Sequence, residues 1–113
     1  MSLQDPLNTF GAEFLEKFPP KKAAVMQRAT DSLVEEFKTK HLLQVGNQEP
    51  DFSLPNAVGE NIRLRDRLAQ GAVILTFYRG VWCPYCNLEL RAYQQVLPQI
   101  HSLGASLIAV SRP

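Results

Sequence analysis

The sequence predicts an α/β fold, and three features of its 113 residues support this. Two continuous apolar segments, residues 72–78 and 105–110, are typical of strands buried on both faces. Between them, residues 84–103 have the apolar spacing of a helix, which completes a βαβ unit with parallel strands and a right-handed crossover. A hairpin and two helices are predicted before this unit. We therefore expect one domain, with a helical extension over residues 1–43 and the main part over residues 44–113.

The start of the chain has the pattern of two amphipathic helices. Asp5 is expected to cap the first, and Pro6 suits its first position, where a missing N–H is tolerated. Pro19 and Pro20 end that helix, and the second is expected to begin near Lys21. One face of each helix carries apolar residues three and four apart, which favours packing against a core or an interface: Leu7, Phe10, Phe14 and Phe18, then Met26, Ala29, Leu33 and Phe37.

The next segment is rich in turn-forming residues and predicts a small hairpin. Residues 50–55 alternate as in a short strand, residues 56–59 form the turn, and residues 62–64 mark the partner strand. Asp66 is expected to cap a short helical turn that ends at Leu68.

The helix of the βαβ unit has clear end signals. Cys83 falls at its N-cap, Pro84 at its first position, and Gly104 just beyond its end. Pro98 lies inside it and should kink it, because proline cannot donate a hydrogen bond to the preceding turn. One stripe of the helix is expected to face the sheet: Cys86, Leu90, Tyr93, Leu97 and Ile100.

Composition excludes several classes of function. The formal net charge of +1 and the lack of a basic stripe argue against nucleic-acid binding. The longest apolar run, residues 72–77, is far shorter than the roughly 20 residues of a membrane-spanning helix. The first residues lack the basic start and apolar stretch of a signal peptide, so a cytoplasmic location is expected.

In a reducing compartment, a Cys-x-x-Cys pair is more often catalytic or metal-binding than a lasting disulfide. A structural zinc site needs four ligands, and His41 and His101 stand apart with no second cysteine pair beside them. No metal is therefore expected. Cys83 and Cys86 are the candidate catalytic residues of a thiol–disulfide redox site that needs no bound cofactor, because sulfur carries the electrons.

The two thiols are expected to have different roles. At the helix N-terminus, unpaired N–H groups and the helix dipole favour the thiolate of Cys83 and can lower a thiol pKa from about 8.5 to as low as ~3.5. Arg79 lies just upstream and adds positive charge. Cys86 should be largely buried against the sheet, so Cys83 is expected to attack and Cys86 to resolve. The alternative is that both thiols are inert small apolar side chains.

The run from Phe77 to Arg91 resembles the peroxiredoxin-like branch of the alkyl hydroperoxide reductase and thiol-specific antioxidant (AhpC/TSA) family, within the thioredoxin superfamily. Residues 50–54 and 108–111 are similar to the family's opening strand and second core strand. The resemblance implies a truncated thioredoxin-like fold and a thiol-dependent oxidoreductase. Its partners would be a thioredoxin- or glutathione-like thiol donor and a peroxide or disulfide substrate. The candidate substrate-binding residues flank the cysteines: Arg79, Trp82, Pro84 and Tyr85.

The sequence departs from the peroxiredoxin pattern at the reactive site. Counting eight residues from Tyr78 places Cys86 at the attacking position, Cys83 where threonine belongs and Arg79 where proline belongs. The threonine that activates peroxide in the family is thus absent. The helix-cap argument favours Cys83 as the attacking thiol, whereas the peroxiredoxin spacing favours Cys86.

The family continues beyond the second core strand, whereas this sequence ends at Pro113. One edge of the strand at residues 72–78 is then expected to be unpaired, and such an edge is a template for another chain. We therefore expect a homo-oligomer, most simply a two-fold dimer that buries the strand edge or exchanges N-terminal helices. The competing functional hypothesis is a non-catalytic truncated module that mainly self-associates.

Overall fold

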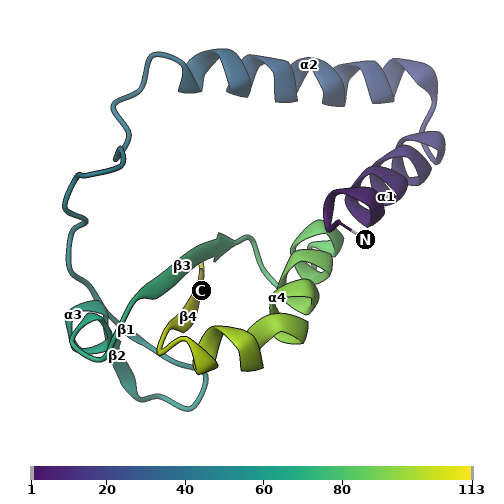
Figure 1. Cartoon of the computed structure of the whole chain (residues 1–113). Helices are drawn as coiled ribbons and strands as arrows, with labels where there is room; N and C mark the ends of the chain where they lie inside the picture. Colours follow the sequence, from purple (N-terminus) through teal and green to yellow (C-terminus); the bar gives the residue numbers. More distant parts are fainter. Residues whose placement is uncertain (1, 113) are drawn as a thin grey trace. The chain divides into compact units, whose positions relative to one another are not determined.

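The structure, a computed structural model, describes residues 2–112 (Figure 1). The chain divides into two compact units, with the boundary between Glu49 and Pro50. The first unit contains α1 (Gln4–Glu16) and α2 (Pro20–Phe37). The second contains β1 (Ser53–Pro55), β2 (Asn61–Arg63), α3 (Leu64–Leu68), β3 (Val73–Tyr78), α4 (Pro84–Ser102) and β4 (Ser106–Ser111). The α/β class is therefore confirmed.

The first unit confirms the two predicted helices but not the cap. Leu3, rather than Asp5, occupies the N-cap of α1 and makes no side-chain cap hydrogen bond. The helix begins earlier than expected, so Asp5 lies in its first turn, where the Ser2 hydroxyl donates to its carboxylate at 3.1 Å. A carboxylate there still interacts favourably with the helix dipole. Pro19 is the N-cap of α2, which begins at Pro20.

The predicted hairpin is present, with β1 and β2 antiparallel from Ser53 opposite Arg63 to Pro55 opposite Asn61. Its turn depends on Asn56, whose side-chain oxygen accepts the backbone N–H groups of Val58 at 3.0 Å and Glu60 at 2.9 Å.

Asp66 does not cap α3, contrary to the expectation. Leu64, assigned to the strand from sequence, is already helical, so Arg63 is the N-cap and Asp66 lies inside the first turn. The carboxylate that caps the start of α3 instead belongs to Asp51, which lies before the hairpin. Its carboxylate accepts the Arg65 backbone N–H at 3.0 Å and the Arg63 Nε–H at 2.8 Å.

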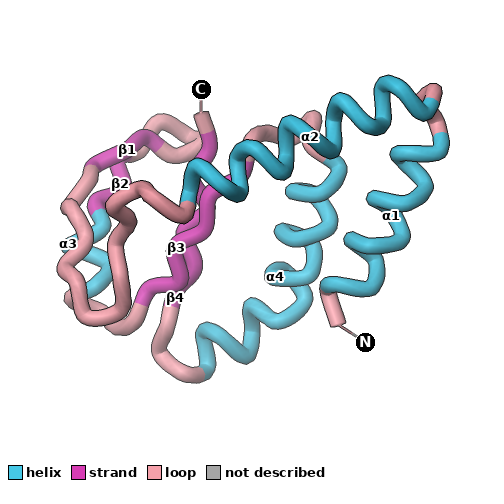
Figure 2. The backbone as a smooth tube through the Cα atoms, turned by 90° about the horizontal axis from the view of Figure 1, so that it is seen from above, coloured by secondary structure: helices cyan, strands magenta, loops and turns pink. Residues whose placement is uncertain are grey.

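The βαβ unit follows the prediction closely. β3 and β4 are parallel, in register from Val73 opposite Ser106 to Tyr78 opposite Ser111, and lie side by side in both views (Figures 1 and 2). α4 connects them, and Figure 1 shows it bent along its length, as expected for a helix that contains Pro98.

The core of the second unit is small. Among the described residues, only Leu64 and Cys83 are buried apolar side chains, at 3% and 5% exposure. The expectation that β3 is buried on both faces is wrong, because Ile74 and Phe77 are 43% and 70% exposed. These two residues lie on opposite faces of the strand, because side chains alternate along it, and in the described sheet β3 has one neighbouring strand, β4. None of the described helices has the length and apolar character needed to cross a bilayer.

Candidate active site

The two cysteines lie where the loop after β3 enters α4. Cys83 is the N-cap of α4, as predicted, and Pro84 is its first residue. Cys86 lies one turn further along. Both thiols are free, and their sulfur atoms are 2.7 Å apart, close enough for either thiol to donate a hydrogen bond to the other. A disulfide, whose sulfur atoms lie about 2.05 Å apart, needs only a small further approach.

Each sulfur accepts a backbone N–H group. Cys86 N–H donates to the sulfur of Cys83 at 3.4 Å, which is the side-chain cap of α4. Arg79 N–H donates to the sulfur of Cys86 at 3.5 Å. Hydrogen bonds to the charged form of a group favour that form. The turn after β3 and the first turn of α4 therefore both stabilise a thiolate.

The expected burial of the two cysteines is reversed. Cys83, expected to be the exposed thiol, is only 5% exposed, whereas Cys86 is half-buried. The sulfur of Cys83 lies beside the first turn of α4, where it accepts the Cys86 N–H and contacts the Cys86 sulfur. Spacing along the helix did not predict this, because the N-cap residue itself lies outside the helical repeat.

The pKa values follow this burial. Desolvation raises the pKa of Cys83, and the hydrogen bond with Cys86 adds to the rise. The pKa of Cys86 is lowered, first by the hydrogen bond from the Cys83 thiol and then by the Arg79 and Gly80 backbone N–H groups. The charge of Glu89 opposes this and raises the Cys86 pKa. The lowered pKa therefore belongs to Cys86, whereas the helix-cap argument favoured the thiolate of Cys83.

Arg79 and Trp82 form a stacked pair beside the cysteines. The guanidinium carbon of Arg79 lies 4.8 Å from the centre of the Trp82 ring, a cation–π distance, and Trp82 is 64% exposed. Gly80, which sequence reasoning missed, permits this arrangement. Its φ is +150°, and a Cβ added to it would lie 2.6 Å from Trp82 Nε1. A glycine two residues after the end of an apolar strand is the signal that could have identified it.

Asn87 is a second residue that sequence reasoning missed. Its side-chain amide donates to the carbonyl oxygen of Val81 at 2.9 Å, which ties the reactive loop to the first turns of α4. Asparagine is a poor helix former, so its place in the first turns of the predicted helix could have indicated a side-chain hydrogen bond to the neighbouring loop.

The four candidate substrate-binding residues lie in the loop before α4 and in its first turn, which also carry the cysteines. Arg79 and Trp82 lie in the preceding loop, Pro84 begins α4, and Tyr85 is 40% exposed beside Cys86. Their contact with a substrate stays a prediction. Among residues 2–112, no three side chains from His, Cys, Asp and Glu converge as metal ligands would.

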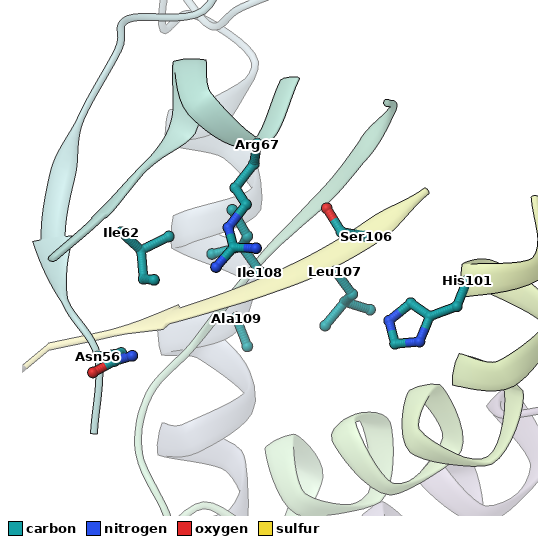
Figure 3. Close-up of a pocket in the computed structure, with 8 residues that line it drawn as sticks. All are labelled: Asn56, Ile62, Arg67, His101, Ser106, Leu107, Ile108 and Ala109. Atoms are coloured by element: carbon teal, nitrogen blue, oxygen red, sulfur yellow. The ribbon is translucent and has the colours of Figure 1, made fainter. Parts of the chain in front are cut away.

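A groove of about 360 Å³ lies elsewhere in the second unit, along β4 (Figure 3). Figure 3 shows Arg67 and His101 reaching its apolar floor from α3 and from the end of α4. Its lining residues include neither cysteine: Asn56, Ile62, Arg67, His101 and Ser106–Ala109.

A family comparison fits this geometry. The model of the AhpC/TSA family matches residues 45–112, which span the hairpin, both core strands and the cysteine pair. The chain belongs to the AhpC/TSA family. The recognised resemblance is thereby confirmed, together with a thioredoxin-like α/β fold.

Curated relatives of this family member are thiol–disulfide oxidoreductases named ResA. The proteins from Bacillus thuringiensis (strain Al Hakam) and Bacillus anthracis are each 31% identical over 74 residues, covering 66% of this chain and 42% of theirs. The protein from Geobacillus thermodenitrificans (strain NG80-2) is 33% identical over 75 residues, with the same coverage of 66% and 42%. The chain thus spans less than half the length of these relatives. No solved structure matches it significantly.

Proposed function

We propose that this chain is a thiol–disulfide oxidoreductase whose Cys83 and Cys86 cycle between a dithiol and an intramolecular disulfide. The observation that carries the proposal is the pair of free sulfur atoms 2.7 Å apart at the start of α4, each with a backbone N–H donor. Membership of the AhpC/TSA family and similarity to ResA proteins support the same class of reaction.

In the proposed reaction, the thiolate of Cys86 attacks one sulfur of a substrate disulfide. The other substrate sulfur leaves as a thiolate, and a mixed disulfide with Cys86 forms. Cys83 then loses its proton and attacks the Cys86 sulfur, which releases the second substrate thiolate. The substrate gains two electrons and the enzyme pair loses two. A thioredoxin- or glutathione-like thiol donor restores the dithiol, and no bound cofactor is needed.

The assignment of Cys86 as the attacking thiol revises the role expected from the helix cap. Cys86 is the more exposed of the two and receives N–H groups from the turn after β3, whereas Cys83 is buried. A buried thiol one turn away is well placed to resolve the mixed disulfide. Trp82, Pro84, Tyr85 and Arg79 form the proposed substrate-contacting rim.

Hydroperoxide is a second candidate substrate, because Cys86 also holds the attacking position in the peroxiredoxin spacing. Attack of the Cys86 thiolate on the peroxide oxygen would give an alcohol and a sulfenic acid. Cys83 would then displace water to form the same disulfide. The residue in the threonine position is Cys83, so we expect slow peroxide reduction.

A cytoplasmic location stays a prediction from the sequence.

The test is a redox titration and a labelling experiment on the native chain. Equilibration with glutathione buffers should give one intramolecular disulfide by mass analysis, and both thiols free in oxidised glutathione would refute the proposal. Iodoacetamide should label Cys86 at lower pH than Cys83, with the urea-unfolded chain as control. Equal labelling rates in the native and unfolded chains would favour the non-catalytic, self-associating module.

Stopped-flow mixing of the reduced chain with hydrogen peroxide, with thiol loss as the readout, distinguishes hydroperoxide from disulfide as the substrate.

Variants of the two cysteines test their roles. Cys83→Ser should trap mixed disulfides on Cys86, whereas Cys86→Ser should stop turnover. The opposite behaviour would return the attacking role to Cys83.

A further inference from the structure

The second helix of the first unit presents apolar side chains that its own unit does not bury. Neither α1 nor α2 contains a buried residue. On α2, Val25, Leu33 and Phe37 are 56%, 54% and 50% exposed. Leu33 and Phe37 lie four residues apart and share a face with Met26 and Ala29, because the α-helix repeats every 3.6 residues. An exposed apolar stripe of this length suits a partner helix.

The charges of α2 are divided between its two ends. Its first half carries Lys21, Lys22 and Arg28, and its second half carries Asp31, Glu35 and Glu36. Lys22 and Glu36 each lie seven residues from Ala29, so helical periodicity places both beside the apolar stripe. A second copy of α2 in the opposite direction would therefore set each Lys22 opposite a Glu36. Parallel copies would set lysine against lysine and glutamate against glutamate.

A groove lies at the basic end of this stripe. It has a volume of about 340 Å³ and is lined by Phe18, Lys21, Lys22, Val25 and Met26. Its floor is apolar, and the two lysines border it. Phe37, at the acidic end of the stripe, is eight residues from Ala29, as is Lys21 on the other side. An antiparallel copy centred on Ala29 would thus bring its Phe37 ring to this groove.

We propose that α2 of this chain pairs with α2 of a second copy, antiparallel about a two-fold axis near Ala29, with Phe37 of each copy in the groove of the other. Such an interface is self-complementary, since every contact occurs twice. It assigns a surface to the homo-oligomer expected from the sequence, and this surface is distinct from the edges of the sheet. It does not depend on the proposed redox chemistry.

Two ion pairs within the chain compete with this arrangement only weakly. Lys38 Nζ contacts Glu35 at 2.7 Å, and Lys40 Nζ contacts Glu36 at 3.7 Å, with side chains 54–71% exposed. Exposed pairs of this kind contribute little. Lys40 Nζ also lies 5.1 Å from the centre of the Phe37 ring, and this exposed contact would be lost when the ring enters the groove of a second copy.

The first experiment measures self-association of the full chain under reducing conditions by sedimentation equilibrium. The wild-type chain should approach twice its 12.7 kDa mass at high micromolar concentration. Lys22→Glu and Glu36→Lys should each weaken dimerisation about tenfold, because each reversal creates two like-charge contacts. An equimolar mixture of the two variants, and the double variant, should both regain wild-type association. Circular dichroism serves as the control for helix content.

The second experiment tests the direction of pairing in a Cys83→Ser, Cys86→Ser background. Ala29→Cys, at the axis, should form an interchain disulfide on mild oxidation. Lys21→Cys is the matched control, because antiparallel pairing places its two copies about 24 Å apart at 1.5 Å per residue. A monomeric wild-type chain, a dimer insensitive to the charge reversals, or efficient cross-linking through Lys21→Cys would each overturn the proposal.

Discussion

Cys83 and Cys86 are three residues apart, yet their surroundings give them opposite pKa shifts. Burial raises the pKa of Cys83, whereas the Cys83 thiol and the Arg79 N–H group lower the pKa of Cys86. Glu89, on the next turn of α4, raises the Cys86 pKa through its charge. The Tyr93 hydroxyl donates to the Glu89 carboxylate at 2.6 Å and so helps to hold that charge in place.

Glu89→Gln should therefore lower the pKa of Cys86, because a negative charge near the thiolate is removed. Thiolate absorbance at 240 nm against pH, measured in a Cys83→Ser background, reports this pKa. Tyr93→Phe, which keeps the charge and removes the hydrogen bond, should change the pKa much less. A higher Cys86 pKa in Glu89→Gln would contradict the electrostatic account.

Gly80 provides a second prediction for single residues. Gly80→Ala forces a side chain into a backbone with φ of +150° and against the Trp82 ring, and should lower the free energy of unfolding by about 1–3 kcal/mol. Displacement of the ring should also change the fluorescence of Trp82, the single tryptophan.

Gly59→Ala is the matched control for this substitution. Gly59 also has positive φ, at +85°, but nothing lies within 4 Å of the added Cβ. The control should lose stability through backbone strain alone and leave the tryptophan fluorescence unchanged. Equal fluorescence changes in the two variants would show that the contact with Trp82 is unimportant.

The hairpin and α3 are joined by the carboxylate of Asp51. Hydrogen bonding from the Arg63 side chain lowers the pKa of Asp51, with a further contribution from the Arg65 backbone N–H. Because the folded-state pKa lies below the unfolded value, the stabilisation is present above the unfolded pKa. It is lost as the pH falls through the folded pKa.

Asp51→Asn should thus destabilise the chain at pH 6, and its difference from wild type should shrink as the pH falls below the ordinary aspartate range. Urea unfolding at several pH values measures this difference. The control is Asp66→Asn. It removes a carboxylate from the first turn of α3 but keeps the ion pair between Asp51 and Arg63. A difference that stays constant down to pH 2 would refute the role of the Asp51 charge.

At the scale of the whole molecule, the two units are joined by an exposed segment. The residues between α2 and β1 form no regular helix or strand, and residues 38–48 are exposed, with Val45 fully so. Exposed connections without regular structure are the preferred sites of proteolysis.

Limited trypsin digestion should therefore cut first after Lys38 or Lys40. Mass spectrometry should detect a fragment that begins at Thr39 or His41 and retains both cysteines. The basic residues inside α2 (Lys21, Lys22 and Arg28) act as internal controls, because a helical backbone resists cleavage. Earlier cleavage within α2 than after Lys40 would contradict the greater accessibility of the segment after α2.

The sequence by itself determined the type and order of the elements of this protein. Apolar periodicity located both N-terminal helices and α4, and the continuous apolar segments located β3 and β4. The pattern of Cys83 followed by Pro84 placed the cysteine pair at a helix N-terminus. These predictions succeeded because they depend on local backbone preferences and on hydrogen bonds between near neighbours in the chain.

Only the tertiary structure decided which of the two thiols ionises first, which carboxylate caps α3 and how exposed β3 is. Burial of Cys83, the approach of the Arg79 N–H to Cys86 and the reach of Asp51 to Arg65 all depend on how the chain folds back on itself. Desolvation and hydrogen bonding act through space, so pKa values and caps of this kind follow from contacts that spacing along the sequence does not specify.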